Sequence, residues 1–182
     1  INLKTNADEA IKGTVVEKMV VVKRAANQTV WNPKIDVWYD DLVRNQTEAC
    51  PAEVMDSEDP FFILYTSGST GKPKGILHTC GGYAVQTLWT GKWIFDFKNG
   101  DVFWCTSDPG WITGHTYAIY SPLLNGITTL FFEGAPDFPE PDRWAKIIEK
   151  HKVTVFYTAP TAIRMFQKYG QEQIKEENLS SL

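Results

Sequence analysis

A ten-residue loop in the middle of the chain has the composition of a phosphate-binding site. Its sequence is Thr66-Ser67-Gly68-Ser69-Thr70-Gly71-Lys72-Pro73-Lys74-Gly75. Seven of these ten residues are Ser, Thr or Gly, so backbone amides and hydroxyl groups can approach an anion without bulky side chains in the way. Lys72 and Lys74 add positive charge. The sequence therefore predicts that the loop 66–75 binds phosphate groups.

The loop could also be a flexible linker or a Walker A loop. Linkers, however, seldom begin directly after a buried strand and carry two lysines. The Walker A pattern G-x-x-x-x-G-K-[ST] fails at two positions, because Pro73 stands where Ser or Thr is required and Thr66 stands where the first Gly is required. Pro73 also removes an amide at the point where the Walker helix would begin. The residues indicate phosphate binding without the Walker arrangement.

A second loop combines a large aromatic side chain, two glycines and an imidazole. Its sequence is Asp108-Pro109-Gly110-Trp111-Ile112-Thr113-Gly114-His115. A loop of this kind after a strand either caps the core or lines a pocket. Residue types alone do not decide between the two, because Trp111 is commonly a core residue and His115 commonly a hydrogen-bonded structural residue.

The elements that must position these loops alternate between strand and helix. Apolar runs of strand length occur at 61–66, 102–106, 127–132 and 153–158. Helical patterns occur at 82–93, 116–124, 141–152 and 160–169, the last closed by Gly170. This alternation predicts an α/β fold, a mostly parallel sheet with helices on both faces. Ligands bind at the carboxyl ends of such strands, so the loops after Thr66, Thr106, Phe132 and Thr158 are the ones of interest.

The first third of the chain carries weaker signals. Residues 19–22 form a β-branched run of strand length, and residues 36–43 have apolar positions near helical spacing. The segment 48–60 contains acidic residues, two prolines and few large apolar side chains, and we expect it to be a connector.

Composition excludes several classes of protein. The chain has 182 residues, of which 43% are hydrophobic. Its net charge of -4 argues against a protein that binds nucleic acids or anionic membranes without specificity. No apolar run approaches the ~20 residues of a membrane span. The cysteines are too far apart for a C-x-x-C motif and are expected to pack as small apolar residues in a reducing, cytoplasmic compartment. They are Cys50, Cys80 and Cys105.

The segment from Tyr65 to Gly75 resembles the phosphate-loop signature of the adenylate-forming superfamily, which includes acyl-CoA synthetases, luciferases and peptide-synthetase adenylation domains. Within it, the chain is similar to the AMP-forming acetyl-CoA synthetases. The segments that carry this similarity are Phe62-Ile63-Leu64, Leu77-His78-Thr79, Trp104-Cys105-Thr106, Gly110-Trp111-Ile112-Thr113-Gly114-His115 and Tyr157-Thr158-Ala159-Pro160-Thr161-Ala162. The resemblance covers most of the chain and is strongest from 59 to 166.

The resemblance implies a two-step ligase reaction with ATP, Mg²⁺ and CoA. A carboxylate attacks the α-phosphorus of ATP to give an acyl-adenylate and pyrophosphate, and the CoA thiol then displaces AMP. The residues expected to hold the ATP phosphates are Thr66, Ser67, Gly68, Ser69, Thr70, Gly71 and Lys72. Lys74 is the expected catalytic residue, which orients the departing pyrophosphate.

The resemblance also implies a carboxylate pocket at the second loop, formed by Trp111, Ile112, Thr113 and Gly114. Ile112 is the expected wall residue, Thr113 a polar contact that also meets CoA, and Gly114 a point of close backbone approach. Several family members carry Val in place of Ile112, and one methylene is worth only ~1 to 3 kcal/mol of discrimination, so acetate and propionate both stay open as substrates. Asp137 falls at a CoA-contacting position, although a solvated turn explains it equally well.

The resemblance places residues 1–182 inside the large N-terminal AMP-binding domain of a longer enzyme. Its later motifs do not occur in the chain: the adenine-binding glycine segment, the Thr-Glu motif that helps hold Mg²⁺, the ribose-binding Asp and the lysine of the mobile C-terminal domain. The expected partners are therefore acetate, ATP, CoA and the missing remainder of the enzyme, with no nucleic acid and no membrane. A non-catalytic nucleotide-binding module and a hydrolase that uses the loop as a true P-loop remain alternatives.

Overall fold

The computed structural model describes residues 2–25, 27–66, 71–170, 172 and 177–182. It divides into two compact units, Ile1–Glu53 and Val54–Leu182. The division falls inside the segment 48–60, and residues 48–59, all of which are described, contain no helix or strand. None of the helices in the described ranges is long and apolar enough to cross a membrane.

The smaller unit is built around a parallel pair of strands. Its elements in chain order are α1 (Leu3–Ala10), β1 (Met19–Val21), β2 (Asp36–Trp38) and α2 (Tyr39–Val43). The strand predicted at 19–22 is confirmed. The helical prediction for 36–43 is wrong for its first three residues, because they pair with β1 and the helix begins only at Tyr39. An ion pair of 2.9 Å joins Lys4 of α1 to the buried Asp36 at the start of β2.

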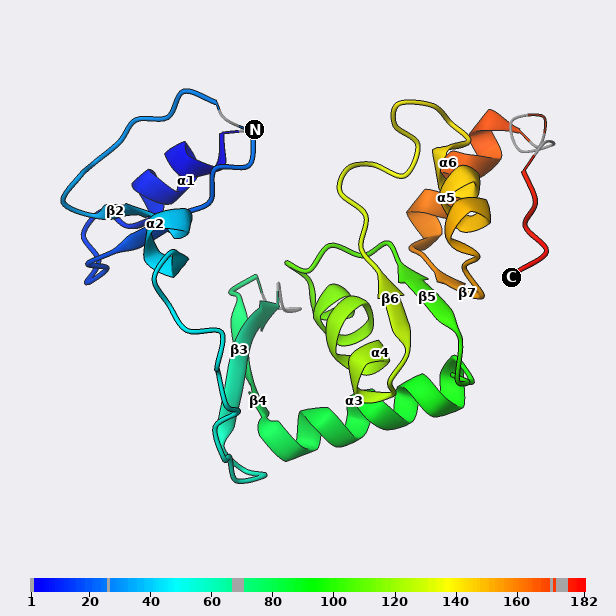
Figure 1. The fold of residues 1–182 in the computed structure, drawn as a ribbon, viewed down its shortest axis with the longest axis horizontal. Coiled ribbons are helices and arrows are strands. Elements are labelled where there is room, and N and C mark those ends of the chain that lie inside the picture. The colour runs from blue at the N-terminus through cyan, green and yellow to red at the C-terminus, as the bar shows by residue number, and fades with distance from the viewer. Residues whose placement is uncertain (1, 26, 67–70, 171, 173–176) are drawn as a thin grey trace. The chain divides into compact units, whose positions relative to one another are not determined.

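The larger unit contains a three-stranded parallel sheet. Its strands are β5 (Val102–Cys105), β6 (Thr128–Leu130) and β7 (Val155–Tyr157), in the order β6-β5-β7. β5 is central, with Trp104 opposite Leu130 of β6 and Phe156 of β7. Figure 1 shows the three strands side by side. Parallel neighbours cannot be joined by a tight turn, so helices provide the connections between them.

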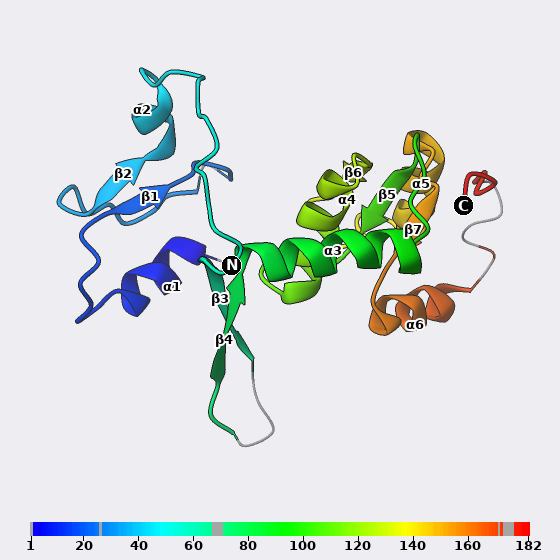
Figure 2. The same ribbon diagram turned by 90° about the horizontal axis from the view of Figure 1, so that it is seen from below.

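Helices cover both faces of this sheet. The helices of the unit are α3 (Cys80–Ile94), the π-helix η1 (Gly114–Tyr120), α4 (Ser121–Leu124), α5 (Arg143–His151) and α6 (Pro160–Tyr169). Side chains alternate along a strand, so Phe103 and Cys105 pack with Ala118 of η1, while Trp104 faces the other way and packs with Ile148 of α5. Figure 2 shows α4 and α5 on opposite sides of β5. The predicted fold class, an α/β sheet with helices on both faces, is confirmed.

The predicted helices are also confirmed, with small shifts at their ends. The pattern at 116–124 forms η1 followed directly by α4, and the pattern at 141–152 forms α5. α5 is amphipathic, with Ala145, Ile147 and Ile148 buried, which is why its apolar spacing was visible in the sequence. Gly170 ends α6 with a positive φ of 78°, a backbone conformation that glycine adopts readily.

A β-hairpin stands outside the parallel sheet. Strand β3 (Pro60–Thr66) pairs antiparallel with β4 (Lys74–Thr79), and within the described residues the two strands form a sheet of their own. The strand at 61–66 was expected in the parallel sheet, and no pattern in the sequence predicted β4. The physical reason is strand pairing: the chain reverses direction after Thr66, so that β4 forms its backbone hydrogen bonds with β3. The glycine-rich loop is therefore a hairpin connection and not a strand-to-helix loop of the parallel sheet.

Candidate functional site

The hairpin holds both ends of the glycine-rich loop at fixed positions. Thr66, the last residue of β3, lies opposite Lys74, the first residue of β4, and both are exposed. Gly71 has φ 83°, a conformation that strains any residue with a Cβ atom. Ser67, Gly68, Ser69 and Thr70, four of the residues expected to hold phosphates, lie outside the described residues.

Gly75 is required for a different reason, which is space. A Cβ atom there would lie 3.1 Å from Ile63 Cγ2 and 3.2 Å from Tyr65 Cζ, because both side chains lean across the hairpin from β3. Within the loop and its flanks, one glycine is thus explained by backbone conformation and another by close packing.

The described end of the loop is cationic and open to solvent. Lys72 and Lys74 are both exposed, and neither forms an ion pair with the described residues. Their ammonium groups are donors only, and the Thr66 hydroxyl is a further exposed donor. This donor chemistry fits an anionic ligand such as a phosphate chain. Across the described ranges, no three His, Cys, Asp or Glu side chains converge in a way that would hold a metal ion.

A cavity of about 520 Å³ lies beside the carboxyl-terminal half of β4, and we call it the β4–α3 cavity. Its wall includes Leu77 and His78 of β4 and part of the first two turns of α3. Ile112 and Thr113 form another part of the wall. The structure thus brings two of the four residues expected in the carboxylate pocket to one cavity, together with a strand that begins at the glycine-rich loop.

The distance between loop and cavity follows from strand geometry. Lys74 and Leu77 are three residues apart on β4, so their Cα atoms are about 10 Å apart at the usual rise of an extended chain.

Trp111 and Gly114, the other two expected pocket residues, do not line this cavity. The Trp111 side chain is 71% exposed. Gly114 is buried, and a Cβ atom there would lie 2.1 Å from the carbonyl oxygen of Asp108. The close backbone approach expected at Gly114 therefore exists in the structure, but it is an approach to the chain's own segment at Asp108. His115 Nδ1 lies 3.1 Å from the carbonyl oxygen of Trp111, as expected of a hydrogen-bonded structural histidine.

Tyr83 and Thr116 also line the β4–α3 cavity, and no motif in the sequence had pointed to either residue. Their hydroxyl oxygens are 2.9 Å apart, and both residues are buried. Desolvation by burial raises the pKa of Tyr83, and the hydrogen bond to Thr116 opposes the rise. The two residues are 33 positions apart, so no local pattern in the sequence could have paired them.

The carboxyl ends of the parallel strands form a second region, with a cavity of about 490 Å³ lined by residues that follow β5 and β6. The Thr106 and Thr158 hydroxyl oxygens are 2.6 Å apart there, joining the ends of β5 and β7. Asp137, the expected CoA contact, lies after β6, where it accepts a hydrogen bond of 3.0 Å from Tyr169. That bond raises the pKa of Tyr169, because Asp137 favours the protonated phenol. Asp137 does not line the β4–α3 cavity.

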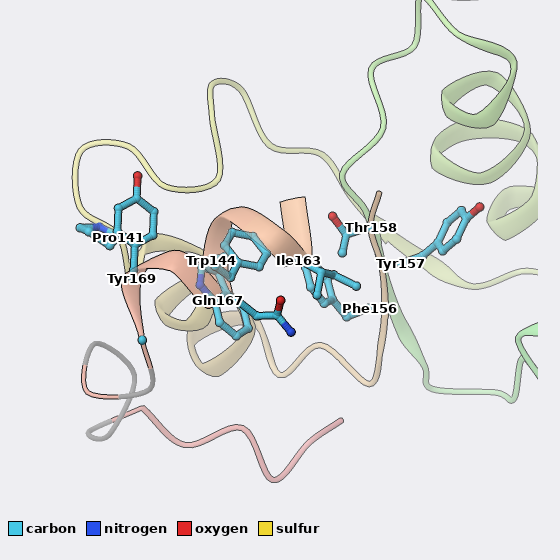
Figure 3. Close-up of a pocket in the computed structure, with 10 residues that line it drawn as sticks. Pro141, Trp144, Phe156, Tyr157, Thr158, Ile163, Gln167 and Tyr169 are labelled. Atoms are coloured by element: carbon cyan, nitrogen blue, oxygen red, sulfur yellow. The ribbon is translucent and has the colours of Figure 1, made fainter. Parts of the chain in front are cut away.

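A third cavity, of about 650 Å³, lies between α5, α6 and β7 (Figure 3). Its wall is mostly apolar: Trp144 stacks on Phe166 with ring centroids 4.7 Å apart, and Phe156 and Ile163 complete that side. Thr158, which directly follows the carboxyl end of β7, also lines this cavity. None of the residues expected to hold phosphate, carboxylate or CoA lines it.

The chain belongs to the AMP-binding enzyme family, whose match covers residues 2–182. An acetyl-coenzyme A synthetase of Rubrobacter xylanophilus is 55% identical over 181 residues, which are 99% of this chain and 28% of that protein. Acetyl-coenzyme A synthetase 2 of Pseudomonas aeruginosa and an acetyl-coenzyme A synthetase of Photobacterium profundum are 50% and 49% identical over the whole chain. The chain spans about 28% of the length of these relatives.

Proposed function

We propose that this chain is part of an AMP-forming acetate-CoA ligase. The observation that carries the proposal is the 49 to 55% identity, over the full chain, to proteins named acetyl-coenzyme A synthetase. In the proposed reaction, an acetate oxygen bonds to the α-phosphorus of ATP and the bond to pyrophosphate breaks. The CoA thiolate then bonds to the acetyl carbon and AMP leaves, so no covalent bond to the protein is needed.

In this proposal the hairpin loop binds the β- and γ-phosphates of ATP. Thr66, the segment 67–71 and Lys72 supply hydroxyl, amide and ammonium donors, and Lys74 orients the pyrophosphate as it departs. Catalysis by this loop is then positioning and charge stabilisation, since the protein forms no bond to phosphorus. Mg²⁺ bound to the phosphates would neutralise the charge that develops on pyrophosphate.

The β4–α3 cavity is the proposed acyl site. Ile112 is its apolar wall and Thr113 its polar contact, with Trp111 and Gly114 completing the same loop. The Thr113 hydroxyl also meets the CoA thiol arm in this proposal, and Asp137 accepts a hydrogen bond from another part of CoA. The cavity wall at Ile112 is then what separates acetate from propionate, by the ~1 to 3 kcal/mol that one methylene supplies.

The rest of the enzyme is part of the proposal. Residues 1–182 belong to a large N-terminal AMP-binding domain, with 48–60 as a connector within it, and further segments complete the adenine, ribose and metal sites. A mobile C-terminal domain supplies a lysine. Acetate, ATP and CoA are the proposed substrates, and the cytoplasm is the proposed location.

Carboxylate-dependent exchange between ATP and pyrophosphate in the complete enzyme tests the proposal. The assay compares acetate, propionate and butyrate, and we expect exchange only when a carboxylate is present, fastest with acetate. Fastest exchange with propionate would make the protein a propionate ligase. Release of inorganic phosphate without a carboxylate would identify a hydrolase, and nucleotide binding with neither product would identify a binding module.

A further inference from the structure

Two hydroxyl groups from different elements meet in the wall of the β4–α3 cavity. Tyr83 lies in the first turn of α3 and Thr116 in η1, and their side-chain oxygens are 2.9 Å apart. Tyr83 is 6% exposed and Thr116 is 4% exposed, so water does not compete freely for this bond. The bond therefore ties the start of α3 to η1 at the cavity itself.

Aromatic rings on several sides hold the Tyr83 ring in place. Phe62 meets it edge to face with ring centroids 4.9 Å apart, and His78 and Tyr120 do so at 5.5 Å each. Phe61 adds a tilted contact at 5.8 Å. These rings come from β3, β4 and η1, so the Tyr83 hydroxyl is fixed by the packing of its own ring.

η1 is held at two points near its start. Gly114 packs against the Asp108 backbone, and Thr116 is bonded to Tyr83. Thr113 directly precedes η1, and Ile112 precedes Thr113, so both cavity-wall residues lead directly into this anchored turn. π-Helical turns are frequent at functional sites because they place side chains that a regular α-helix would not.

We infer that Tyr83 is a positioning residue for acyl-group selection: through its hydrogen bond to Thr116 it holds Ile112 and Thr113 in the wall of the β4–α3 cavity. This inference rests on the proposed function, because it concerns how the same cavity limits the size of the carboxylate. Loss of the bond lets the η1 turn relax away from α3, and the cavity then admits one more methylene at lower cost.

The test uses the complete enzyme and the ratio of kcat/KM for acetate to kcat/KM for propionate. Tyr83→Phe keeps the ring and removes the hydroxyl, and Thr116→Val removes the other end of the same bond with little change in shape. We expect each variant to lower this ratio of kcat/KM values roughly fivefold, which corresponds to the free energy of about one hydrogen bond. The KM for ATP is expected to stay nearly unchanged. The double variant is expected to match either single variant, since both remove one shared interaction.

Two controls separate this role from general destabilisation. Thr116→Ser keeps the hydroxyl and is expected to keep the wild-type ratio. Tyr120→Phe removes a hydroxyl from another ring that contacts Tyr83. No partner among the described residues accepts or donates a hydrogen bond to that hydroxyl, so this variant is expected to leave the ratio unchanged. If Tyr83→Phe does not fold, the comparison of Thr116→Val with Thr116→Ser decides the question.

A ratio that stays at the wild-type value in both Tyr83→Phe and Thr116→Val, or in Thr116→Val alone where Tyr83→Phe does not fold, overturns the inference while the proposed function stands. An equal loss with Thr116→Ser as with Thr116→Val also overturns it, because the hydroxyl would then not be the cause. Absence of carboxylate-dependent exchange in the wild-type enzyme overturns the proposed function itself, and this inference with it.

Discussion

The loops that carry the candidate chemistry are rich in glycine for reasons that differ from residue to residue. Gly71 has a positive φ, Gly75 lies under two side chains of β3, and Gly114 meets a carbonyl oxygen of the chain. Of these three glycines, Gly71 alone has no atom of the described residues within 4 Å of the position that a Cβ atom would take. The glycines of these loops therefore answer different structural requirements: a positive φ at Gly71, and close packing at Gly75 and Gly114.

Lys74 offers the most direct test at this scale. Its ammonium group is exposed at the start of β4 and is not consumed by an ion pair with the described residues. In the complete enzyme, Lys74→Ala is expected to lower the rate of acetate-dependent ATP–pyrophosphate exchange by roughly 10²-fold, because one preorganised charge on the phosphates is lost. Lys150→Ala, at an exposed position in the last turn of α5, is the matched control and should leave the rate near wild type. An unchanged rate in Lys74→Ala would show that this lysine does not orient pyrophosphate.

At the scale of elements, the hairpin packs against α3 and η1 through aromatic rings. A two-stranded hairpin is marginally stable by itself. Here Phe61 and Phe62 of β3 pack on Tyr83 of α3, and Phe61 also meets Tyr120 of η1 with ring centroids 5.3 Å apart. The same aromatic contacts that support the hairpin therefore also border the β4–α3 cavity.

The close packing of Gly114 at the start of η1 leads to a prediction about the free energy of unfolding. Gly114→Ala would place a methyl group 2.1 Å from the Asp108 carbonyl oxygen and 2.8 Å from Pro109 Cα, and neither backbone atom can move freely. We expect a loss of about 3 kcal/mol in the free energy of unfolding, measured by urea denaturation of the complete enzyme.

Gly110→Ala is the matched control for Gly114→Ala. It lies in the same loop, but its Cβ atom would meet only the Asp108 side chain, at 2.8 Å from Oδ1. That side chain can rotate away, so the cost is expected to be well below that of Gly114→Ala. Equal stability of the two variants would mean that the approach of Gly114 to Asp108 is not tight in solution.

At the scale of the whole molecule, the proposed function gives this chain only part of a site. The proposed phosphate loop, the β4–α3 cavity and Asp137 all lie within Val54–Leu182, while the relatives are several times longer than the chain. The resemblance assigns adenine, ribose and metal contacts to motifs that do not occur in residues 1–182. Positioning of both substrates is the main source of rate in a reaction of this kind, so a partial site should lose nearly all of it.

We therefore predict that residues 1–182 alone form no acetyl-CoA from acetate, ATP and CoA, under conditions in which the complete enzyme does. Thioester is measured after incubation of each protein at equal concentration. Thiol alkylation tells whether the isolated chain is folded. Cys50 is exposed, so the expectation that all three cysteines pack as apolar residues is wrong for it, and its thiol should react quickly. Cys105 is 5% exposed and burial raises the pKa of its thiol, so it should react only after unfolding. Thioester formation by a chain with a protected Cys105 would contradict the prediction.

The sequence alone determined the strand and helix alternation from 102 to 169, because each of these elements has an apolar periodicity that is local to it. It also predicted a site at Lys72, Lys74, Ile112 and Thr113, although Lys74 begins β4 and Ile112 and Thr113 are helical in the structure. Pairing between distant segments was decided only by the tertiary structure: β4 and β2 became strands because a partner lay beside them. The same holds for Tyr83 and Thr116, which share a hydrogen bond across 33 residues that no periodicity in the chain encodes.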